Sequence, residues 1–132
     1  MSKSINNQKS IVLFDDIPVR RVWVEAEEKW YFAVADVIKV LAESKDPHGY
    51  IKDMRRRDAE LSKGWGQIAT PLMIDTKGGK QRVNCSNVEG ILRIIQSIPS
   101  KKAEPFKQWL ARVGYERLQE TVDPEQALNR AR

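Results

Sequence analysis

The stretch Trp30-Tyr31-Phe32-Ala33-Val34-Ala35-Asp36-Val37 contains the point where this sequence changes from the pattern of a strand to the pattern of a helix. Its aromatic and β-branched first part, Trp30–Val34, is typical of a strand. From Ala35 onward the apolar residues recur at helical spacing as far as Leu41. A strand that leads directly into an amphipathic helix predicts a fold that mixes both kinds of element.

The residues before this junction predict two further strands. Ile11–Phe14 is a short apolar run, and Val19–Glu25 alternates between apolar and polar positions. Asp15–Pro18 supplies a turn between them, and Ala26–Lys29 supplies a turn into the junction strand. The three strands predict a small antiparallel meander. Residues 1–10 are polar and are expected to form a flexible leader.

The residues after the junction predict a second helix and a long β-hairpin. Asp46 is an N-cap and Pro47 occupies the first helical position, so the helix begins there and is expected to run to Lys63. Trp65–Arg82 is expected to return to strand, with a hairpin turn at Thr76–Lys80. Within that turn, Gly78-Gly79 meets the demand of a two-residue turn for positive φ, and Gln81–Cys85 is the returning strand.

The C-terminal part of the sequence predicts further helices. Ser86 with Glu89 three residues later has the spacing of a capping box, and an amphipathic helix follows it. After a break at Pro99, another helix is expected to extend to Leu118. The prediction is an α+β domain over residues 11–120, with a small antiparallel sheet and a long hairpin packed against about four helices. Residues 121–132 are expected to form a C-terminal helix that leads into a further region of a longer chain.

Composition excludes several classes of protein. Apolar residues make up 41% and charged residues 31%, as in soluble globular domains. No window approaches the roughly 20 apolar residues that a membrane span needs, and the polar N-terminus lacks the apolar centre of a secretory signal. One cysteine cannot build a disulfide framework, so we expect a cytoplasmic protein. A net charge of +5 favours polyanionic partners without specifying one.

The sequence offers little for catalysis. His48 is the only histidine, and we interpret it as a solvated residue at a helix start, because no partner at the spacing of a metal site or a triad accompanies it. Cys85 precedes a predicted helix N-terminus, which would lower its pKa somewhat, yet a buried structural thiol is the favoured interpretation. The acidic residues lie in turns, where solvated charge is the default. We therefore expect no enzyme activity, no metal and no cofactor.

Two basic clusters are candidates for contact with nucleic acid. One lies on the polar side of the second helix, and the other lies on the predicted hairpin, where no acidic residue separates the cations. A basic helix or a two-stranded ribbon can contact phosphates and fits a major groove. The candidate residues are Lys52, Arg55 and Arg56 of the helix and Lys77, Lys80 and Arg82 of the hairpin.

Each of these assignments has an alternative. Lysine and arginine also solubilise exposed turns, and Asp53, Asp58 and Glu60 dilute the charge of the helix cluster. Trp65 stands between two glycines, where its ring could anchor a partner protein or stack on a base. Packing over the edge of the core is the favoured role for this tryptophan.

Three blocks of the sequence resemble the signatures of a known family. Trp30–Val37 followed by Leu41 is similar to the aromatic, Asp-Val and Leu signature of the Bro-N domain, which occurs in phage antirepressors and in proteins of large DNA viruses. Asn84–Ser97 resembles the second signature of that family, and Ala103–Leu110 resembles the third. The blocks occur in the order that the family has.

The sequence departs from antirepressors after the third block. Those proteins have a Leu-Pro-centred stretch where this chain has Val113-Gly114-Tyr115-Glu116-Arg117. Together with Asp123-Pro124-Glu125, this stretch resembles more closely the DNA-damage-inducible protein D branch of the family.

The resemblance implies DNA binding and phage-type regulation, and it assigns no catalytic residue. The leading hypothesis is therefore a regulatory module that binds duplex DNA through the two basic clusters. The competing hypothesis is a module that binds a repressor or a recombination or repair protein, with Trp65 and the last helix as the contact surface. A homodimer through the terminal helices is compatible with either hypothesis and required by neither.

Overall fold

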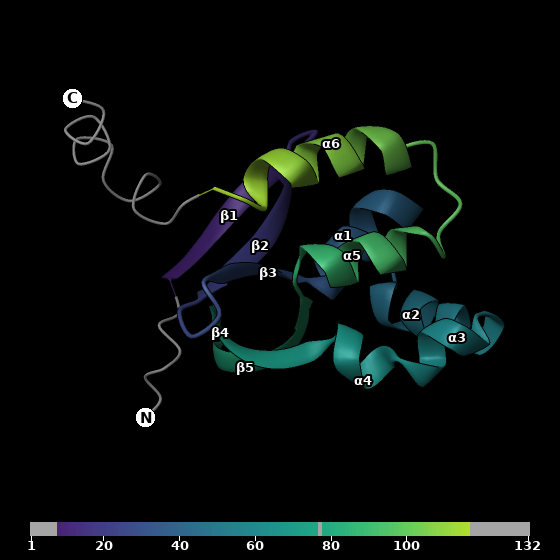
Figure 1. Ribbon diagram of the computed structural model, residues 1–132, viewed down its shortest axis with the longest axis horizontal. Helices are drawn as coiled ribbons and strands as arrows, with labels where there is room; N and C mark the ends of the chain where they lie inside the picture. The colour runs from purple at the N-terminus through teal and green to yellow at the C-terminus, as the bar shows by residue number, and fades with distance from the viewer. Residues whose placement is uncertain (1–7, 77, 117–132) are drawn as a thin grey trace.

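A computed structural model describes residues 8–76 and 78–116. Its elements in chain order are β1 Gln8–Phe14, β2 Ile17–Val24, β3 Lys29–Ala33, α1 Val34–Ala42, α2 Pro47–Arg57, α3 Ala59–Lys63, α4 Trp65–Ile68, β4 Thr70–Thr76, β5 Gly79–Ser86, α5 Val88–Ile95 and α6 Ala103–Val113. The strands form one antiparallel sheet in the order β1-β2-β3-β5-β4 (Figure 1). The predicted α+β class, with a meander, a hairpin and packed helices, is confirmed.

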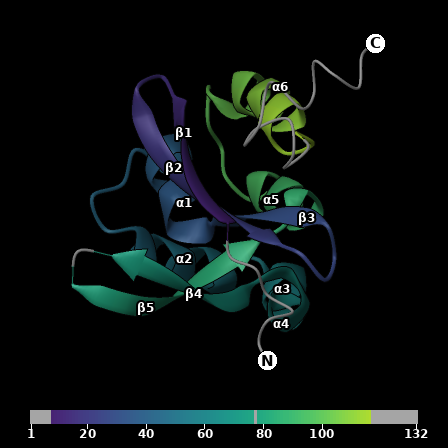
Figure 2. The same ribbon diagram turned by 90° about the vertical axis from the view of Figure 1, so that its left-hand side faces the viewer.

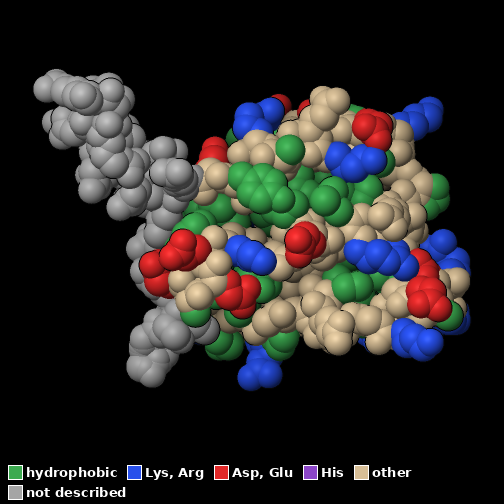
Figure 3. All heavy atoms as spheres, in the orientation of Figure 1, with side chains coloured by type: hydrophobic (Ala, Val, Ile, Leu, Met, Phe, Trp, Pro, Cys, Tyr) green, Lys and Arg blue, Asp and Glu red, His purple; other side chains and the backbone are tan. Residues whose placement is uncertain are grey.

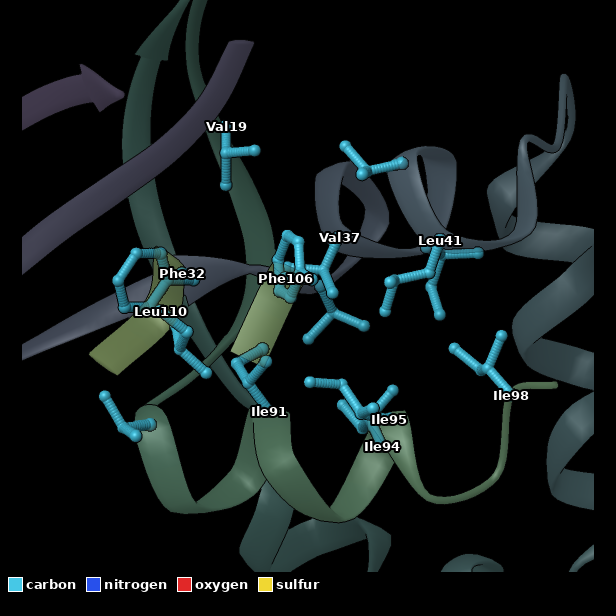
Figure 4. Close-up of a cluster of buried hydrophobic side chains, with 14 of the residues drawn as sticks. Val19, Phe32, Val37, Leu41, Ile91, Ile94, Ile95, Ile98, Phe106 and Leu110 are labelled. Carbon is cyan, nitrogen blue, oxygen red and sulfur yellow. The ribbon is translucent and has the colours of Figure 1, made fainter. Parts of the chain in front are cut away.

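The main core lies between the helices and one face of the first three strands. Phe32 of β3, Ile91 of α5 and Phe106 of α6 are each 0% exposed and meet in its centre (Figure 4). Val37 and Leu41 of α1 extend this cluster beyond the end of β3. Burial of each such side chain stabilises the fold by about 1.5–3 kcal/mol, so this cluster dominates the stability of the domain.

A smaller core holds the β4–β5 hairpin. The register joins β5 to β3 only near the hairpin base, where Ser86 lies opposite Phe32 and Cys85 lies opposite Ala33. From there the hairpin extends away from the other three strands (Figure 2). A cluster separate from the main core fixes it: its buried members are Val22, Val24, Tyr31, Ile74 and Cys85. The hairpin is therefore anchored at one end and projects at the other.

The strand-to-helix junction is held to β2 by one carboxylate. Asp36, in the first turn of α1, accepts hydrogen bonds from the backbone N–H of Arg20 at 2.9 Å and from its guanidinium at 2.9 and 3.0 Å. The hydrogen bonds that the Arg20 guanidinium donates to Asp36 raise the pKa of Arg20 above its ordinary value. This contact fixes where α1 begins relative to the sheet, and every later element packs on that arrangement.

The predicted second helix is wrong in its length, although Asp46 caps its start as expected. The helix ends at Arg57, and Asp58 adopts an extended conformation before α3. The Asp58 carboxylate accepts the N–H of Leu61 at 3.0 Å and also contacts Arg93 and Ser97 of the distant α5 segment. These contacts make an N-cap more favourable at this position than a continuous helix.

The prediction that strand resumes at Trp65 is also wrong. Trp65–Ile68 forms α4, a single helical turn, because the Trp65 indole packs in the main core. At the hairpin tip, Gly79 has φ +108° and pairs with Thr76, so it belongs to the returning strand rather than to the two-residue turn. The returning strand, β5, ends at Ser86, one residue after the predicted end at Cys85.

The predicted capping box at Ser86 is wrong as well. Ser86 ends β5 and donates its hydroxyl to the carbonyl of Ile68, whereas Asn87 caps α5 by accepting the N–H of Gly90 at 2.9 Å. The first strand begins at Gln8, three residues before the predicted start. The predicted extension of the penultimate helix to Leu118 is also wrong, because α6 ends at Val113 and residues 114–116 are not helical. Residues 1–7 of the predicted leader and the predicted C-terminal helix at residues 121–132 lie outside the described residues.

Candidate nucleic-acid interface

The basic residues of α2 surround one shallow hollow. Lys52, Arg55 and Arg56 line it together with Ser62 of α3, and its volume is about 220 Å³. The guanidinium of Arg55 lies over the ring of Trp65, 5.0 Å from its centroid. Its Nε is buried and has no hydrogen-bond partner among the described residues. The tryptophan therefore orients the Arg55 side chain at the edge of the hollow.

The other two cations of this hollow are exposed to solvent. Arg56 pairs with Asp53 at 3.0 Å, but the two side chains are 70% and 62% exposed. A pair this exposed contributes about 0–1 kcal/mol, so a phosphate can replace Asp53 at little cost. Within residues 8–76 and 78–116, Lys52 has no carboxylate at salt-bridge distance. The hollow thus presents cations that are weakly compensated.

The hairpin carries the second basic group on its outward face. Alternation along β5 turns Val83 and Cys85 toward the smaller core, which leaves Lys80 and Arg82 on the opposite face. Both are exposed, and neither forms a salt bridge with any side chain that the structure describes. The register places Arg82 opposite Met73, which is 44% exposed, and Lys80 opposite Asp75. Lys77 lies outside the described residues.

The two groups remain separate but occupy the same half of the molecule. The hairpin and α2–α4 lie in the lower half of both ribbon views, with α6 at the top (Figures 1 and 2). Two cations near α6 have acidic partners: Lys102 pairs with Glu43 at 3.4 Å and Lys107 pairs with Glu104 at 2.6 Å. The sequence identified the two exposed groups. It did not identify Ser62, because α3 was expected to continue α2.

Of the remaining candidate residues, Trp65 and Cys85 are buried in the fold and His48 is exposed. Trp65 is 8% exposed and belongs to the main core, in agreement with the packing role; its contact with a partner remains a prediction. Cys85 is buried, and burial raises the pKa of its thiol to about 12, so the expected lowering by the helix N-terminus is wrong. Desolvation of the thiolate outweighs the effect of that helix end. His48 is exposed, in the first turn of α2.

No group of acidic, histidine or cysteine side chains suited to a metal ion occurs among the described residues. In the same part of the chain, each helix is too short or too polar to cross a bilayer.

Comparison with known families assigns the domain. The sequence pattern of the BRO family, N-terminal domain (Bro-N), matches residues 18–122. The chain belongs to the Bro-N family. Comparisons with curated proteins and with solved structures found no match to this chain. The three Bro-N-like blocks of the sequence lie at the β3–α1 junction, along α5 and in α6, where they contribute Phe32, Ile91 and Phe106 to the core.

Proposed function

We propose that this Bro-N domain is a non-enzymatic regulatory module that binds duplex DNA. The observation that carries the proposal is the outward face of the β4–β5 hairpin, where Lys80 and Arg82 are exposed and unpaired with any described carboxylate. The hollow of Lys52, Arg55 and Arg56 provides a second contact. Family membership supports the same function.

The two contacts have complementary roles in the proposed complex. A two-stranded ribbon has the width of the major groove, so the hairpin can enter it while Lys80 contacts a phosphate and the Arg82 fork reaches a guanine edge. The α2 hollow would contact a phosphate on the neighbouring backbone, and the contact of Arg55 with Trp65 supports this role because it holds the guanidinium in one orientation. An oriented cation loses less side-chain entropy on binding. In the complex the hollow positions the domain and the hairpin discriminates between sequences.

The proposed biological role is based on the resemblance to Bro-N proteins. We propose a cytoplasmic protein of prophage type that regulates transcription as an antirepressor does. Val113-Gly114-Tyr115-Glu116-Arg117 and Asp123-Pro124-Glu125 favour a role near DNA-damage-inducible protein D. A reporter gene measured with and without DNA damage in cells that express the chain would distinguish the two roles, because only the second predicts a response that depends on damage.

Salt dependence of DNA binding tests the proposed interface. If about five phosphates are neutralised, log affinity falls with log salt at a slope near −4 to −5. In Lys80→Gln/Arg82→Gln the slope becomes shallower by about 0.9, because the phosphate contact of Lys80 is removed, whereas Arg82 contacts a base. The matched control is Lys101→Gln/Arg112→Gln, which makes the same change in charge at exposed residues near α6. Equal slopes for the two double variants would refute the assignment of the hairpin.

A second candidate function is binding to a protein such as a repressor or a recombination protein. One observation favours it: a hollow lined by two tryptophans and several glutamates lies apart from the basic hairpin face. Binding of a purified candidate protein after nuclease treatment would support this function. Loss of that binding after nuclease treatment would leave DNA as the bridge. A homodimer through the terminal helices remains a prediction.

A further inference from the structure

The second hollow lies where three segments that are distant in sequence meet. The β2–β3 turn, the start of α5 and the residues that follow α6 enclose a volume of about 680 Å³. Its lining residues are Trp23, Glu25, Glu28, Lys29, Trp30, Asn87, Val88, Glu89, Gly114, Tyr115 and Glu116. A volume of this size holds several side chains of a ligand, and it falls in the range of pockets that bind small molecules or peptide anchors.

Indole rings form one wall of the hollow. Trp23 and Trp30 make an edge-to-face pair with their centroids 5.2 Å apart. Trp30 is 2% exposed and lies at the back of the hollow, whereas Trp23 is half-buried and faces the opening. The Nε1 of Trp23 donates to Glu25 at 3.0 Å, which fixes the ring beside a carboxylate. Adjacent indole and carboxylate groups attract a planar cation through both ring quadrupole and charge.

The charge of the hollow is opposite to that of the whole chain. The chain has a net charge of +5, yet Glu25, Glu28 and Glu89 line this hollow against one cation, Lys29. Figure 3 shows a group of acidic side chains in the region of the β2–β3 turn. The start of α5 adds only a weak positive field, because Asn87 already accepts the N–H of Gly90.

An arginine of the chain itself already binds to this wall. The guanidinium of Arg21 lies 3.9 Å from the centroid of the Trp30 ring and 2.7 Å from Glu116. It approaches from the protein side and is 2% exposed. The same pair of groups, indole and glutamate, is repeated on the solvent side by Trp23 and Glu25. The solvent side therefore carries an adjacent indole and carboxylate, the two kinds of group that Arg21 contacts.

We propose that this hollow binds an arginine-containing segment of a partner protein. Glutamates at the rim would repel a phosphate backbone, so DNA is not the occupant. A single small cation would leave most of 680 Å³ empty, whereas a short peptide with arginine side chains fills the hollow and pairs with the glutamates. The surface is chemically distinct from the basic groups that we assign to DNA, so the domain can connect DNA to a protein.

Binding of defined peptides to the full chain tests this site. The probes are capped, fluorescein-labelled heptapeptides of glycine and serine that carry one, two or three arginines, and the same peptides with citrulline in place of arginine. Anisotropy at low salt should show affinity that rises with the number of arginines and falls at least tenfold with citrulline. Quenching of tryptophan fluorescence by the unlabelled peptide should accompany binding, because Trp23 faces the opening.

Charge variants locate the binding within the fold. Glu25→Gln/Glu28→Gln should weaken the three-arginine peptide about tenfold, since each partly exposed ion pair contributes up to about fivefold. The matched control Asp15→Asn/Asp16→Asn removes the same charge at the exposed turn at the other end of β2 and should bind like the unmodified chain. Circular dichroism and thermal melting verify that both variants fold.

Three results would overturn the proposal. They are no binding of any arginine peptide up to millimolar concentration, equal weakening by both double variants, and equal affinity for arginine amide and for the three-arginine peptide. The last result would indicate a small-cation site instead. DNA affinity measured on Glu25→Gln/Glu28→Gln is an independent readout of the proposed function, and it should not decrease.

Discussion

Replacement of Arg21 should destabilise the domain much more than replacement of its acidic partner. Arg21 is the buried cation of β2: it donates to the carbonyl of Val113 at 2.6 Å and pairs with Glu116 at 2.7 Å. The Val113 carbonyl belongs to the last turn of α6, where carbonyls have no partner within the helix. In Arg21→Met this carbonyl loses the hydrogen bond from Arg21, and the stacking contact with Trp30 is lost with it.

The structure sets the size of the effect. A buried hydrogen bond from a charged donor contributes about 1.5–3 kcal/mol, and a desolvated cation–π contact contributes up to about 2 kcal/mol. The desolvation cost of the arginine, which methionine avoids, offsets part of this sum. We expect a net loss of about 2–3 kcal/mol. A folded unit of roughly 110 residues has an unfolding entropy of about 0.23 kcal/mol/K, so the Tm should fall by about 10 °C.

Thermal melting and urea unfolding measure this loss directly. The comparison variant is Glu116→Gln, whose side chain is 40% exposed and whose backbone carbonyl still accepts Nε1 of Trp30. It should lose less than about 1 kcal/mol, because a solvated carboxylate contributes little to an ion pair. A Tm for Arg21→Met within 3 °C of the unmodified chain would refute the reasoning, as would equal losses for the two variants.

Three further predictions concern single side chains. The hydrogen bonds from Ser97 and from the Leu61 N–H, together with Arg93, lower the pKa of Asp58 to about 2. The ionised Asp58 carboxylate therefore stabilises the fold fully above pH 4, and this contribution to the free energy of unfolding is lost as the pH falls toward 2. Unfolding of Asp58→Asn measured across that range should lack this pH-dependent contribution. Asn87→Ala should cost about 1 kcal/mol, or about 4 °C in Tm, through loss of the α5 cap; an unchanged Tm would count against the assigned cap. Burial raises the pKa of Cys85 to about 12, so a thiol reagent at pH 8 should label the native protein far more slowly than the protein in denaturant; equal rates would contradict burial.

The parts of the fold that the sequence predicted are those that local interactions determine. The strand-to-helix change near Ala35 follows from a change in apolar spacing, and the Asp46 cap precedes its proline directly. Gly79, the strand residue directly after the tight turn, adopts positive φ because few other residues can do so. These signals lie within a few residues of the structure that they specify.

The parts that the sequence did not predict depend on residues far along the chain. The break at Asp58 requires Arg93 and Ser97, which are 35 and 39 residues away. Asn87 rather than Ser86 caps α5, because the Ser86 hydroxyl bonds Ile68. A list of local propensities does not contain these pairings, since they exist only after the sheet and α5 have packed.

In the candidate interface, too, some features could be predicted from local sequence and others could not. Exposure of Lys80 and Arg82 could be inferred from an isolated basic hairpin sequence. The orientation of Arg55 by Trp65 could not, because α3 and α4 must first turn the chain back onto α2. The acidic hollow was missed altogether, since Glu25, Glu89 and Glu116 come from three separate segments. Convergence of charge on a surface is a property of the tertiary structure.

Acetylation of lysines with and without duplex DNA tests the central claim most directly. Mass spectrometry compares the rates at Lys52 and Lys80 with those at Lys29 and Lys101, all four of which are exposed in the folded chain. We predict that DNA protects Lys52 and Lys80 and leaves Lys29 and Lys101 unchanged. Protection of Lys29 and Lys101 with full labelling of Lys52 and Lys80 would contradict the account, because DNA would then bind a different face.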